Sequence, residues 1–415
     1  MDLLRVGWRN LLRNRRRTIL NVAALAIGTA IMIVSIAWVR GYFTSFYEGI
    51  INLDTGHAQV LHREYHAEQR RLPLDLSVAD YEPLRNELME IDAVIAVAAR
   101  LTFAARIGDG TRATHLVGRG IEPAREAQIT VIDGNIVDGS YLSEGIPGVL
   151  LSSTFASRLG VSPGDEIVID VIDRHGAPRS ARRTLEGTFR LGYPAIDESM
   201  FFMDLPSVQE LLAMEGRATQ LVLRLDSGPS IDPLPAMIRD RVGRLRDDPT
   251  LTLEEWRTFV AAIVSLVEAD IAGFSIIIVV LYVLVIIGIL NSMSMAVHER
   301  TREIGTLRAI GMKRGQLIRL FLAEGVGIAL LGAATGVVLA AAAGLYFGGV
   351  GFDLTALEGT GLPIPFAERF TADFRVWDFV AGTGVGVLTA TAGSIIPARR
   401  ASRLQIADAL RSHLE

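Results

Sequence analysis

Cysteine is absent from this chain of 415 residues, and lysine is almost absent. Without cysteine the chain can form neither disulfide bonds nor a thiolate metal site. The single lysine, Lys313, lies between Met312 and Arg314, whereas a P-loop that cradles nucleotide phosphates needs Gly-Lys-Ser or Gly-Lys-Thr. The chain therefore has no P-loop of its own.

Metal-binding patterns are weak as well. His57, His62 and His66 cluster, and His62-Arg63-Glu64-Tyr65-His66 loosely resembles a zinc-binding helix. The metallopeptidase motif needs glutamate directly after the first histidine, and Glu64 stands one place later. The three histidines are better interpreted as polar residues where the chain leaves a strand. We expect no metal, no cofactor, no catalytic residues and no nucleic-acid partner.

Charge is also missing from four long apolar runs, and half of all residues are hydrophobic. A bilayer core of about 30 Å needs roughly 20 apolar helical residues, and only a helix satisfies its own backbone in lipid. No acid or base lies at the centre of a run, which disfavours an ion-coupled carrier. A cleaved signal peptide is the alternative for the first run, but that run is long for a signal and three more follow. The predicted spans are residues 18–39, 271–297, 320–352 and 379–398; the uncharged run of the third span begins at Gly325, after Glu324.

Small residues recur at intervals of four in the last three spans and predict close helix packing. They are Gly288, Ser292, Ala296, Gly332, Gly336, Gly382, Gly386 and Ala390.

The distribution of arginine predicts which loops lie on the cytoplasmic side of the membrane. Arginines concentrate before the first span, between the second and third spans, and after the fourth, whereas the 353–378 loop holds five acids and two arginines. Because cytoplasmic loops carry the excess of basic residues, we expect both termini and the loop 298–319 in the cytoplasm. Residues 40–270 and the loop 353–378 are then outside, and residues 399–415 form a cytoplasmic tail.

The long outer segment has the alternation of a folded α+β domain. Strands and helices follow the order β-α-β-β, then an insertion, then β-α-β, which suggests a split arrangement similar to the ferredoxin-like fold. The insertion, about 129–214, is predicted to form its own β-rich lobe. Within it, Pro163-Gly164-Asp165 predicts a turn between a helix at Ser153–Leu159 and a strand at Glu166–Ile172. The predicted fold class is an α-helical membrane protein with four transmembrane helices and a large α+β extracytoplasmic domain.

Two segments beside the first two spans carry apolar residues at steps of three and four, as in a coiled-coil seam. One interpretation is that both spans continue outward as a paired stalk; ordinary packing against the outer domain is the other, and the pattern does not separate them. The stalk candidates are Val39, Phe43, Phe46, Ile50, Trp256, Val260, Ile263 and Val267.

The most informative segment is the predicted cytoplasmic loop HERTREIGTLRAIGMKRGQLIRLFLAEG, His298–Gly325. Ile304, Leu307 and Ile310 recur at three-residue spacing, which predicts a short amphipathic helix, and Gly311 can end it in the left-handed conformation. The sequence of this segment closely resembles a loop of the FtsX/MacB/LolC family of ABC permeases. The N-terminal LRVGWRNLLRNRRRT resembles that family's amphipathic first helix, here 1–17. PARRASRLQIADALR near the end resembles its tail, with Ile406 in place of the usual proline.

The resemblance implies that the loop is a coupling helix seated in a groove of a separate ATPase, which holds the ATP and magnesium. It assigns that contact to Glu299, Arg302, Glu303, Ile304, Leu307, Arg308, Ile310 and Gly311. A lone four-span permease with a large outer domain is most similar to the LolC/LolE lipoprotein-release group. In that group two permease protomers, identical or different, work with two ATPase subunits in the bacterial inner membrane, and a periplasmic carrier receives the lipoprotein. The alternative is an FtsX-like regulator, in which the same motion switches a cell-wall hydrolase and nothing is transported.

Overall fold

The computed structural model describes residues 15–108, 113–227, 234–353 and 369–404. The predicted N-terminal helix before residue 15, most of the 353–378 loop and the tail beyond residue 404 lie outside these residues. The chain divides into two compact units. A helical unit contains Met1–Phe43, Leu266–Asp353 and Arg369–Glu415, and a sheet domain is built mainly from Thr44–Ser265.

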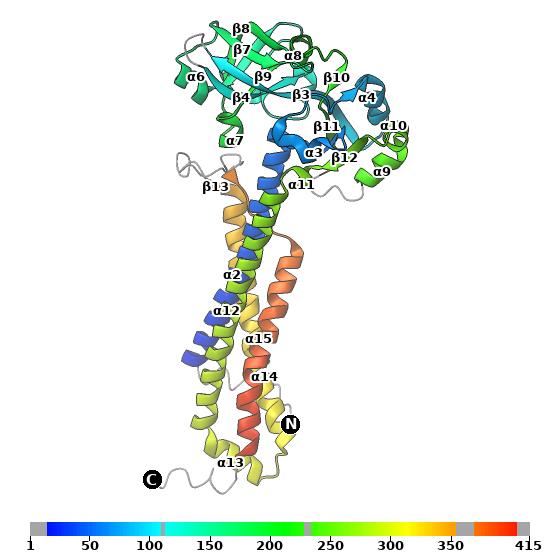
Figure 1. Cartoon of the computed structure of the whole chain (residues 1–415). Helices are drawn as coiled ribbons and strands as arrows, with labels where there is room; N and C mark the ends of the chain where they lie inside the picture. The colour runs from blue at the N-terminus through cyan, green and yellow to red at the C-terminus, as the bar shows by residue number, and fades with distance from the viewer. Residues whose placement is uncertain (1–14, 109–112, 228–233, 354–368, 405–415) are drawn as a thin grey trace. The chain divides into compact units, whose positions relative to one another are not determined.

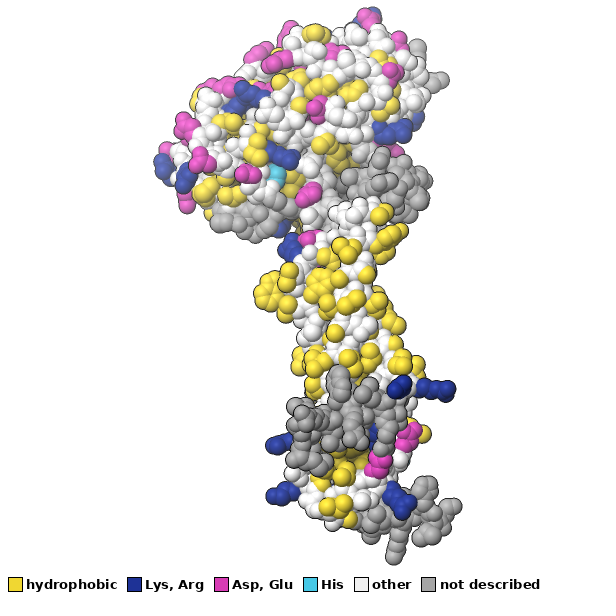
Figure 2. Space-filling model, turned by 180° about the vertical axis from the view of Figure 1, so that it is seen from behind, with side chains coloured by type: hydrophobic (Ala, Val, Ile, Leu, Met, Phe, Trp, Pro, Cys, Tyr) yellow, Lys and Arg dark blue, Asp and Glu magenta, His cyan; other side chains and the backbone are white. Residues whose placement is uncertain are grey.

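Among the residues that the structure describes, four long helices are apolar enough to cross a membrane, as predicted from the sequence (Figure 1). Hydrophobic side chains dominate the visible surface of these helices, whereas the visible surface of the sheet domain mixes charged and uncharged side chains (Figure 2). Such a helix surface suits lipid. The helices are α2 (Arg15–Ile50), α12 (Ala261–Glu299), α14 (Arg314–Val350) and α15 (Val376–Arg403).

Glycines let α2 approach α14 and α15 closely. A Cβ atom on Gly336 of α14 would lie 2.7 Å from the carbonyl oxygen of Ala26, and one on Gly382 of α15 would lie 2.5 Å from Cγ1 of Ile33. Both distances are too short for any side chain, so the predicted close packing is confirmed at these positions. It is wrong for Gly288, whose Cβ position has no described atom within 4 Å.

The first part of the sheet domain follows the predicted ferredoxin-like order. Its strands run β12-β1-β11-β3, all antiparallel, with α4 (Tyr81–Met89) connecting β1 to β3 and α9 (Leu234–Arg241) and α10 (Gly243–Asp247) preceding β12. Two βαβ units thus interleave in one sheet, as the alternation of the sequence predicted. The strands are β1 (Ala58–His62), β3 (Val94–Gly108), β11 (Gln220–Leu225) and β12 (Leu251–Glu255).

The inserted segment does not form a sheet of its own. Its strands join β3 and β4 in a closed cycle of pairings, β3-β4-β9-β6-β8-β7 and back to β3. The long β3 makes this possible, because it reaches from the ferredoxin-like part into the insertion, and closure removes exposed strand edges. The strands of the cycle besides β3 are β4 (Ala113–Ile121), β6 (Gly148–Ser152), β7 (Glu166–Ile172), β8 (Pro178–Phe189) and β9 (Met200–Asp204), and β5 (Ile136–Gly139) pairs with β8 outside it.

Short elements complete the sheet domain. Helix α8 packs on β3 and β4, and the main hydrophobic core lies between such helices and the sheet. These elements are α3 (Tyr65–Glu68), α5 (Pro123–Glu126), α6 (Ser153–Leu159), α7 (Pro194–Asp197), α8 (Leu205–Leu212), α11 (Trp256–Phe259), β2 (Val78–Ala79) and β10 (Arg217–Ala218).

Candidate functional site

The predicted coupling loop contains a short helix, α13 (Thr301–Ala309), between α12 and α14. Gly311 follows it with a backbone φ of +104°, the left-handed region that glycine enters without steric cost. The backbone N–H of Lys313 then donates to Oε1 of Gln316 at 2.9 Å, which starts α14. The chain therefore turns sharply twice, and α13 is held between two long helices.

One face of α13 is buried in the helical unit. Ile304 is 3% exposed and packs in a cluster with residues of α12, α14 and α15, including Val297, Leu317 and Ala398. Burying such a side chain contributes on the order of 2 kcal/mol. Ile304 therefore fixes α13 to the spans, and the structure does not present it to a partner as the resemblance implied.

Arg308 also points back to the spans. Its Nη1 donates to the carbonyl oxygens of Ser402, at 3.1 Å, and Leu404, at 2.9 Å. These carbonyls belong to the C-terminal end of α15, where unpaired carbonyl groups and the helix dipole favour a cation. Arg308 thus ties α13 to α15, a contact that the sequence pattern did not predict.

A buried ion pair stands directly before α13. Nη1 of Arg300 lies 3.3 Å from Oε2 of Glu324 in α14, and both side chains are almost fully buried. Removing one partner of a buried pair is strongly destabilising, because the other charge then stays buried alone. Sequence reasoning missed this pair; the signal was a glutamate at the edge of an apolar run with an arginine at the end of the preceding span.

The remaining coupling candidates are more accessible. Glu299, Arg302 and Glu303 are exposed, Ile310 is 81% exposed, and Leu307 is partly exposed. One face of α13 is thus anchored, while exposed residues on and beside the helix mix both charges with one apolar side chain.

The stalk candidates fall into different environments. Phe43, Phe46 and Ile50 are buried on α2, and Val39 is half-buried. The second segment is not one continuous helix, because α11 ends at Phe259 and α12 begins at Ala261, with Val260 between them at φ −120°.

Trp256 belongs to the core of the sheet domain. It is fully buried, and its ring centroid lies 4.9 Å from that of Tyr47. Val260 is partly buried and packs against the same core, whereas the side chains of Ile263 and Val267 lie outside the described part. Ordinary packing therefore accounts for Trp256, and the transmitting role of the other residues stays a prediction.

Possible chemical sites in the sheet domain are already engaged. Nε2 of His57 lies 3.0 Å from the carbonyl oxygen of Ser227, Nδ1 of His62 accepts from the backbone N–H of Glu64, and the ring of His66 packs edge-on against Phe259. Within the described residues no group of three His, Cys, Asp or Glu side chains could hold a metal ion.

A Gly-x-Ser-x-Gly match, Gly160–Gly164, also occurs in this domain. It lies in the turn from α6 into β7. A nucleophile elbow joins a strand to a helix, so the match has the wrong structural context.

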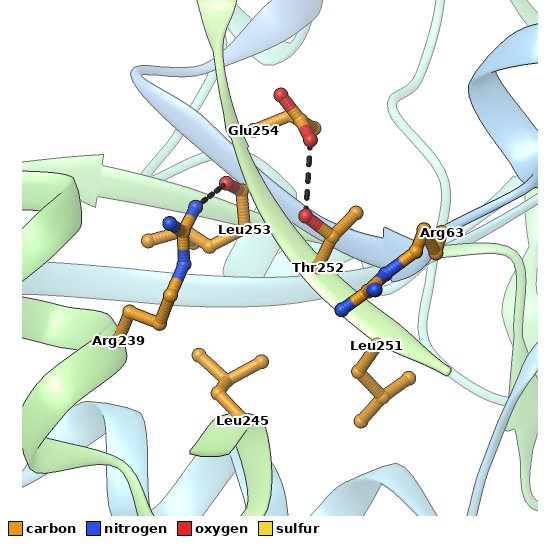
Figure 3. Close-up of a pocket in the computed structure, with 7 residues that line it drawn as sticks. All are labelled: Arg63, Arg239, Leu245, Leu251, Thr252, Leu253 and Glu254. Atoms are coloured by element: carbon orange, nitrogen blue, oxygen red, sulfur yellow. Dashed lines mark hydrogen bonds between the residues drawn. The ribbon is translucent and has the colours of Figure 1, made fainter. Parts of the chain in front are cut away.

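A pocket of about 370 Å³ lies against β12 (Figure 3). Nη2 of Arg239 donates to the carbonyl oxygen of Leu253, and Oγ1 of Thr252 donates to Glu254, both at 3.0 Å. These polar groups bind one another, and the lining offers no nucleophile paired with a base. Its residues are Arg63, Arg239, Leu245, Leu251, Thr252, Leu253 and Glu254.

Comparison with known proteins gives two family matches. Residues 18–241, more than half of the chain, match the MacB-like periplasmic core domain, and residues 275–406 match the FtsX-like permease C-terminal family. The chain is 24% identical over 441 aligned positions to the lipoprotein-releasing system transmembrane protein LolC of Xylella fastidiosa, covering 98% of both chains. It is 36% identical over 124 residues to the macrolide export ATP-binding/permease protein MacB of Shewanella sp., which is 30% of this chain and 16% of that protein.

Among solved structures, the periplasmic region of MacB from Actinobacillus actinomycetemcomitans aligns with 52% of this chain and 94% of its own, at 10% identity and a TM-score of 0.38. The conclusion rests on the family matches and on the four apolar helices. The chain belongs to the family of the MacB-like periplasmic core domain and, with its FtsX-like C-terminal region, is a multi-pass ABC transporter permease of the LolC/LolE/MacB type.

Proposed function

We propose that this permease couples ATP hydrolysis by a separate ATPase to work on the other side of the membrane through movement of its helices. One observation carries the proposal: α13 is anchored to three membrane helices at once. Ile304 packs among α12, α14 and α15, and Arg308 binds the end of α15. A force applied to α13 is therefore passed to all three helices, because packed cores move as rigid bodies rather than deform.

The ATPase is proposed to bind the exposed residues on α13 and at its two ends, Glu299, Arg302, Glu303 and Ile310, with Leu307 at the border of this surface. Mixed charges steer and orient a partner, and an apolar side chain supplies affinity on burial. Two such ATPases would pair with two permease protomers, either identical or different. ATP and magnesium would be held entirely by the ATPase, since this chain has no P-loop.

The proposed substrate class is lipoproteins in the outer leaflet of the bacterial inner membrane. It is supported by the likeness to LolC, a lipoprotein-releasing protein, over 98% of both chains. With no ionisable residue at the centre of a predicted span, mechanical release suits this chain better than an aqueous pathway. A periplasmic carrier that receives the lipoprotein would complete the cycle.

The ATPase contact is tested by charging Ile310. In Ile310→Asp the exposed apolar side chain is lost while the buried anchors remain, so the ATPase should no longer co-purify from native membranes. Losing about 2 kcal/mol of binding corresponds to roughly thirtyfold weaker affinity. Leu307→Asp should act in the same direction. Ile146→Asp, the same change at an exposed isoleucine of the sheet domain, is the matched control.

If Ile310→Asp recovers the ATPase normally and keeps substrate-stimulated ATP turnover, the exposed residues around α13 are only solvated and do not bind the ATPase. The substrate proposal is tested separately, by release of a fluorescent lipoprotein from proteoliposomes. Recovery of a cell-wall hydrolase on the sheet domain, in place of a lipoprotein carrier, would replace release by the regulatory function.

A further inference from the structure

The end of α2 has an unusual local structure. Directly after Ile50 the chain forms a π-helical turn, η1 (Ile51–Thr55), closed by a 3.0 Å hydrogen bond from the backbone N–H of Gly56 to the carbonyl oxygen of Ile51. Gly56 has φ +61°, and a Cβ atom there would lie 2.4 Å from Cγ1 of Val222. Only Gly56 and His57 separate η1 from β1, so α2 passes almost directly into the sheet. Single π-helical turns of this kind occur frequently at functional sites.

Three arginines from three adjacent strands hold η1. Nη1 of Arg119 in β4 lies 2.6 Å from Oδ1 of Asp54, and Nη1 of Arg100 in β3 donates to the carbonyl oxygen of the same residue. Nη1 of Arg224 in β11 donates to the side-chain oxygen of Asn52. The order β11-β3-β4 makes these strands neighbours. The contacts therefore spread any load on η1 across the centre of the sheet.

The central arginine is itself fixed. The Arg100 and Glu126 side chains are both fully buried, and the guanidinium reaches the two carboxylate oxygens at 2.5 and 3.1 Å. Burial alone would lower the pKa of the Arg100 guanidinium, but the charges of Glu126 and Asp54 outweigh it and raise that pKa above its ordinary value. A fork of several donors in one plane lets a single arginine hold Glu126 and η1 together.

A backbone contact supports the same arrangement. The N–H of Val131 donates to the carbonyl oxygen of Asn52 at 3.1 Å, and Nη1 of Arg224 also donates to the carbonyl oxygen of Ile129 at 3.2 Å. Residues 129–131 follow α5, which carries Glu126. The turn η1 is thus bound to three strands and to the segment after α5, far more contacts than a simple connector needs.

We propose that η1, with Asp54 and Asn52 held by Arg100, Arg119 and Arg224, is the rigid joint through which movement of α2 is delivered to the sheet domain. The inference rests on the proposed function, because it names the residues that carry the transmitted force. A flexible link at this point would absorb the movement, whereas a clamped turn passes it on.

The joint is tested first without any partner, in the full chain in lipid nanodiscs. Spin labels on cysteines introduced at Glu48 in α2 and Ile95 in β3, both exposed, report the position of α2 relative to β3. The cysteine-free sequence makes these labels unique. Asp54→Asn combined with Arg119→Gln should broaden the distance distribution. It should also speed hydrogen exchange at the Val131 amide by roughly tenfold or more, since charge-assisted hydrogen bonds close that contact.

The matched control removes another arginine–aspartate pair of the sheet domain, one that does not contact η1. Arg106 in β3 lies 2.8 Å from Asp170 in β7, and Arg106→Gln with Asp170→Asn should leave both readouts unchanged. If the double variant at Asp54 and Arg119 does not fold, Arg224→Gln makes the same test by removing only the contacts to Asn52 and Ile129. If a folded variant keeps a narrow spin-label distance distribution and wild-type hydrogen exchange at the Val131 amide, η1 is not a rigid joint.

The second arm measures ATP turnover and lipoprotein release with the co-purified ATPase in proteoliposomes. The double variant at Asp54 and Arg119 should keep ATP turnover within about twofold of wild type, because the ATPase contact is untouched. It should lose most of its lipoprotein release, because the loosened joint no longer passes the movement of α2 to the sheet domain. Release at the wild-type rate from a variant whose distance distribution has broadened overturns the transmitting role. Failure of the proposed function is distinguishable, since wild-type protein would then release no lipoprotein while its distance distribution stays narrow.

Discussion

The guanidinium of Arg40 in α2 meets the carboxylate of Asp378 in α15 with two parallel contacts, Nη1 to Oδ2 at 2.7 Å and Nη2 to Oδ1 at 2.8 Å. Asp378 also accepts the backbone N–H of Arg375 at 2.9 Å and so caps α15. Two-point contacts of this kind fix orientation as well as distance. Helices α2 and α15 are therefore joined at this level by the ion pair of Arg40 and Asp378.

Replacing Asp378 by asparagine should destabilise the permease, because the buried end of the pair loses its charge while Arg40 stays in place. The expected loss is about 1.5–3 kcal/mol, the range for a hydrogen bond to a charged group. Thermal unfolding of the full chain in nanodiscs measures it. Asp373→Asn is the control, since the Asp373–Arg375 pair is largely exposed and should change little. Equal melting curves for the two variants would mean that the Arg40 pair does not stabilise the helices.

Gly336 is a site where a single methyl group should separate two helices. Its Cβ would meet a carbonyl oxygen and the side chain of Thr29, neither of which can move without shifting α2. Gly336→Ala should therefore cost roughly 1–3 kcal/mol, although alanine is the better helix former. Gly384→Ala, where nothing described lies within 4 Å, should be neutral or slightly stabilising. Unfolding in nanodiscs compares the two, and a Gly336→Ala protein as stable as Gly384→Ala would contradict close packing.

His57 should make the sheet domain sensitive to acid. The side chain is 4% exposed, and its burial, with Arg224 nearby, lowers the pKa of the imidazole below its ordinary value. In the unfolded chain the pKa returns to about 6.5. Above that pH neither state is protonated and the full stability is present. As the pH falls below it, only the unfolded state takes up the proton, so stability is lost until the folded pKa is passed.

The measurement is thermal unfolding of the full chain at several values between about pH 7.5 and 5, where the two states differ in bound protons. His57→Gln should remove part of the acid-induced loss, by about 1.4 kcal/mol for each unit of pKa difference. His115→Gln, at an exposed histidine of β4, should retain the wild-type profile. An unchanged acid response in His57→Gln would exclude this histidine as its source.

The orientation in the membrane can be read by chemical labelling. A cysteine introduced at Ser180, exposed on β8, should react with an impermeant maleimide in intact spheroplasts, whereas one at Ser412 should react only after lysis. The cysteine-free background gives no competing signal. Labelling of both positions, or of Ser412 alone, in intact spheroplasts would reverse or abolish the proposed topology.

Local patterns were reliable guides wherever the decisive contacts are close in sequence. The helix at Ser153–Leu159 and the strand at Glu166–Ile172 have the predicted bounds, and Gly164 between them has the positive φ, +99°, that favours glycine in a turn. The four spans follow from apolar length alone, because a bilayer requires it. The absence of a P-loop needed only the position of one lysine.

The tertiary structure decided what depends on distant partners. The insertion is β-rich as predicted, but the fold decided that β3 pairs with β7 and β4 with β9 in a closed cycle, since no local signal specifies which strands meet. The same holds for α13. Its periodicity predicted an amphipathic helix, but only the fold shows that Ile304 and Arg308 face the spans while Ile310 faces away. Sequence determines which side chains share a face of a helix, whereas packing against other elements decides which face is covered, because burial is a property of the whole assembly of helices.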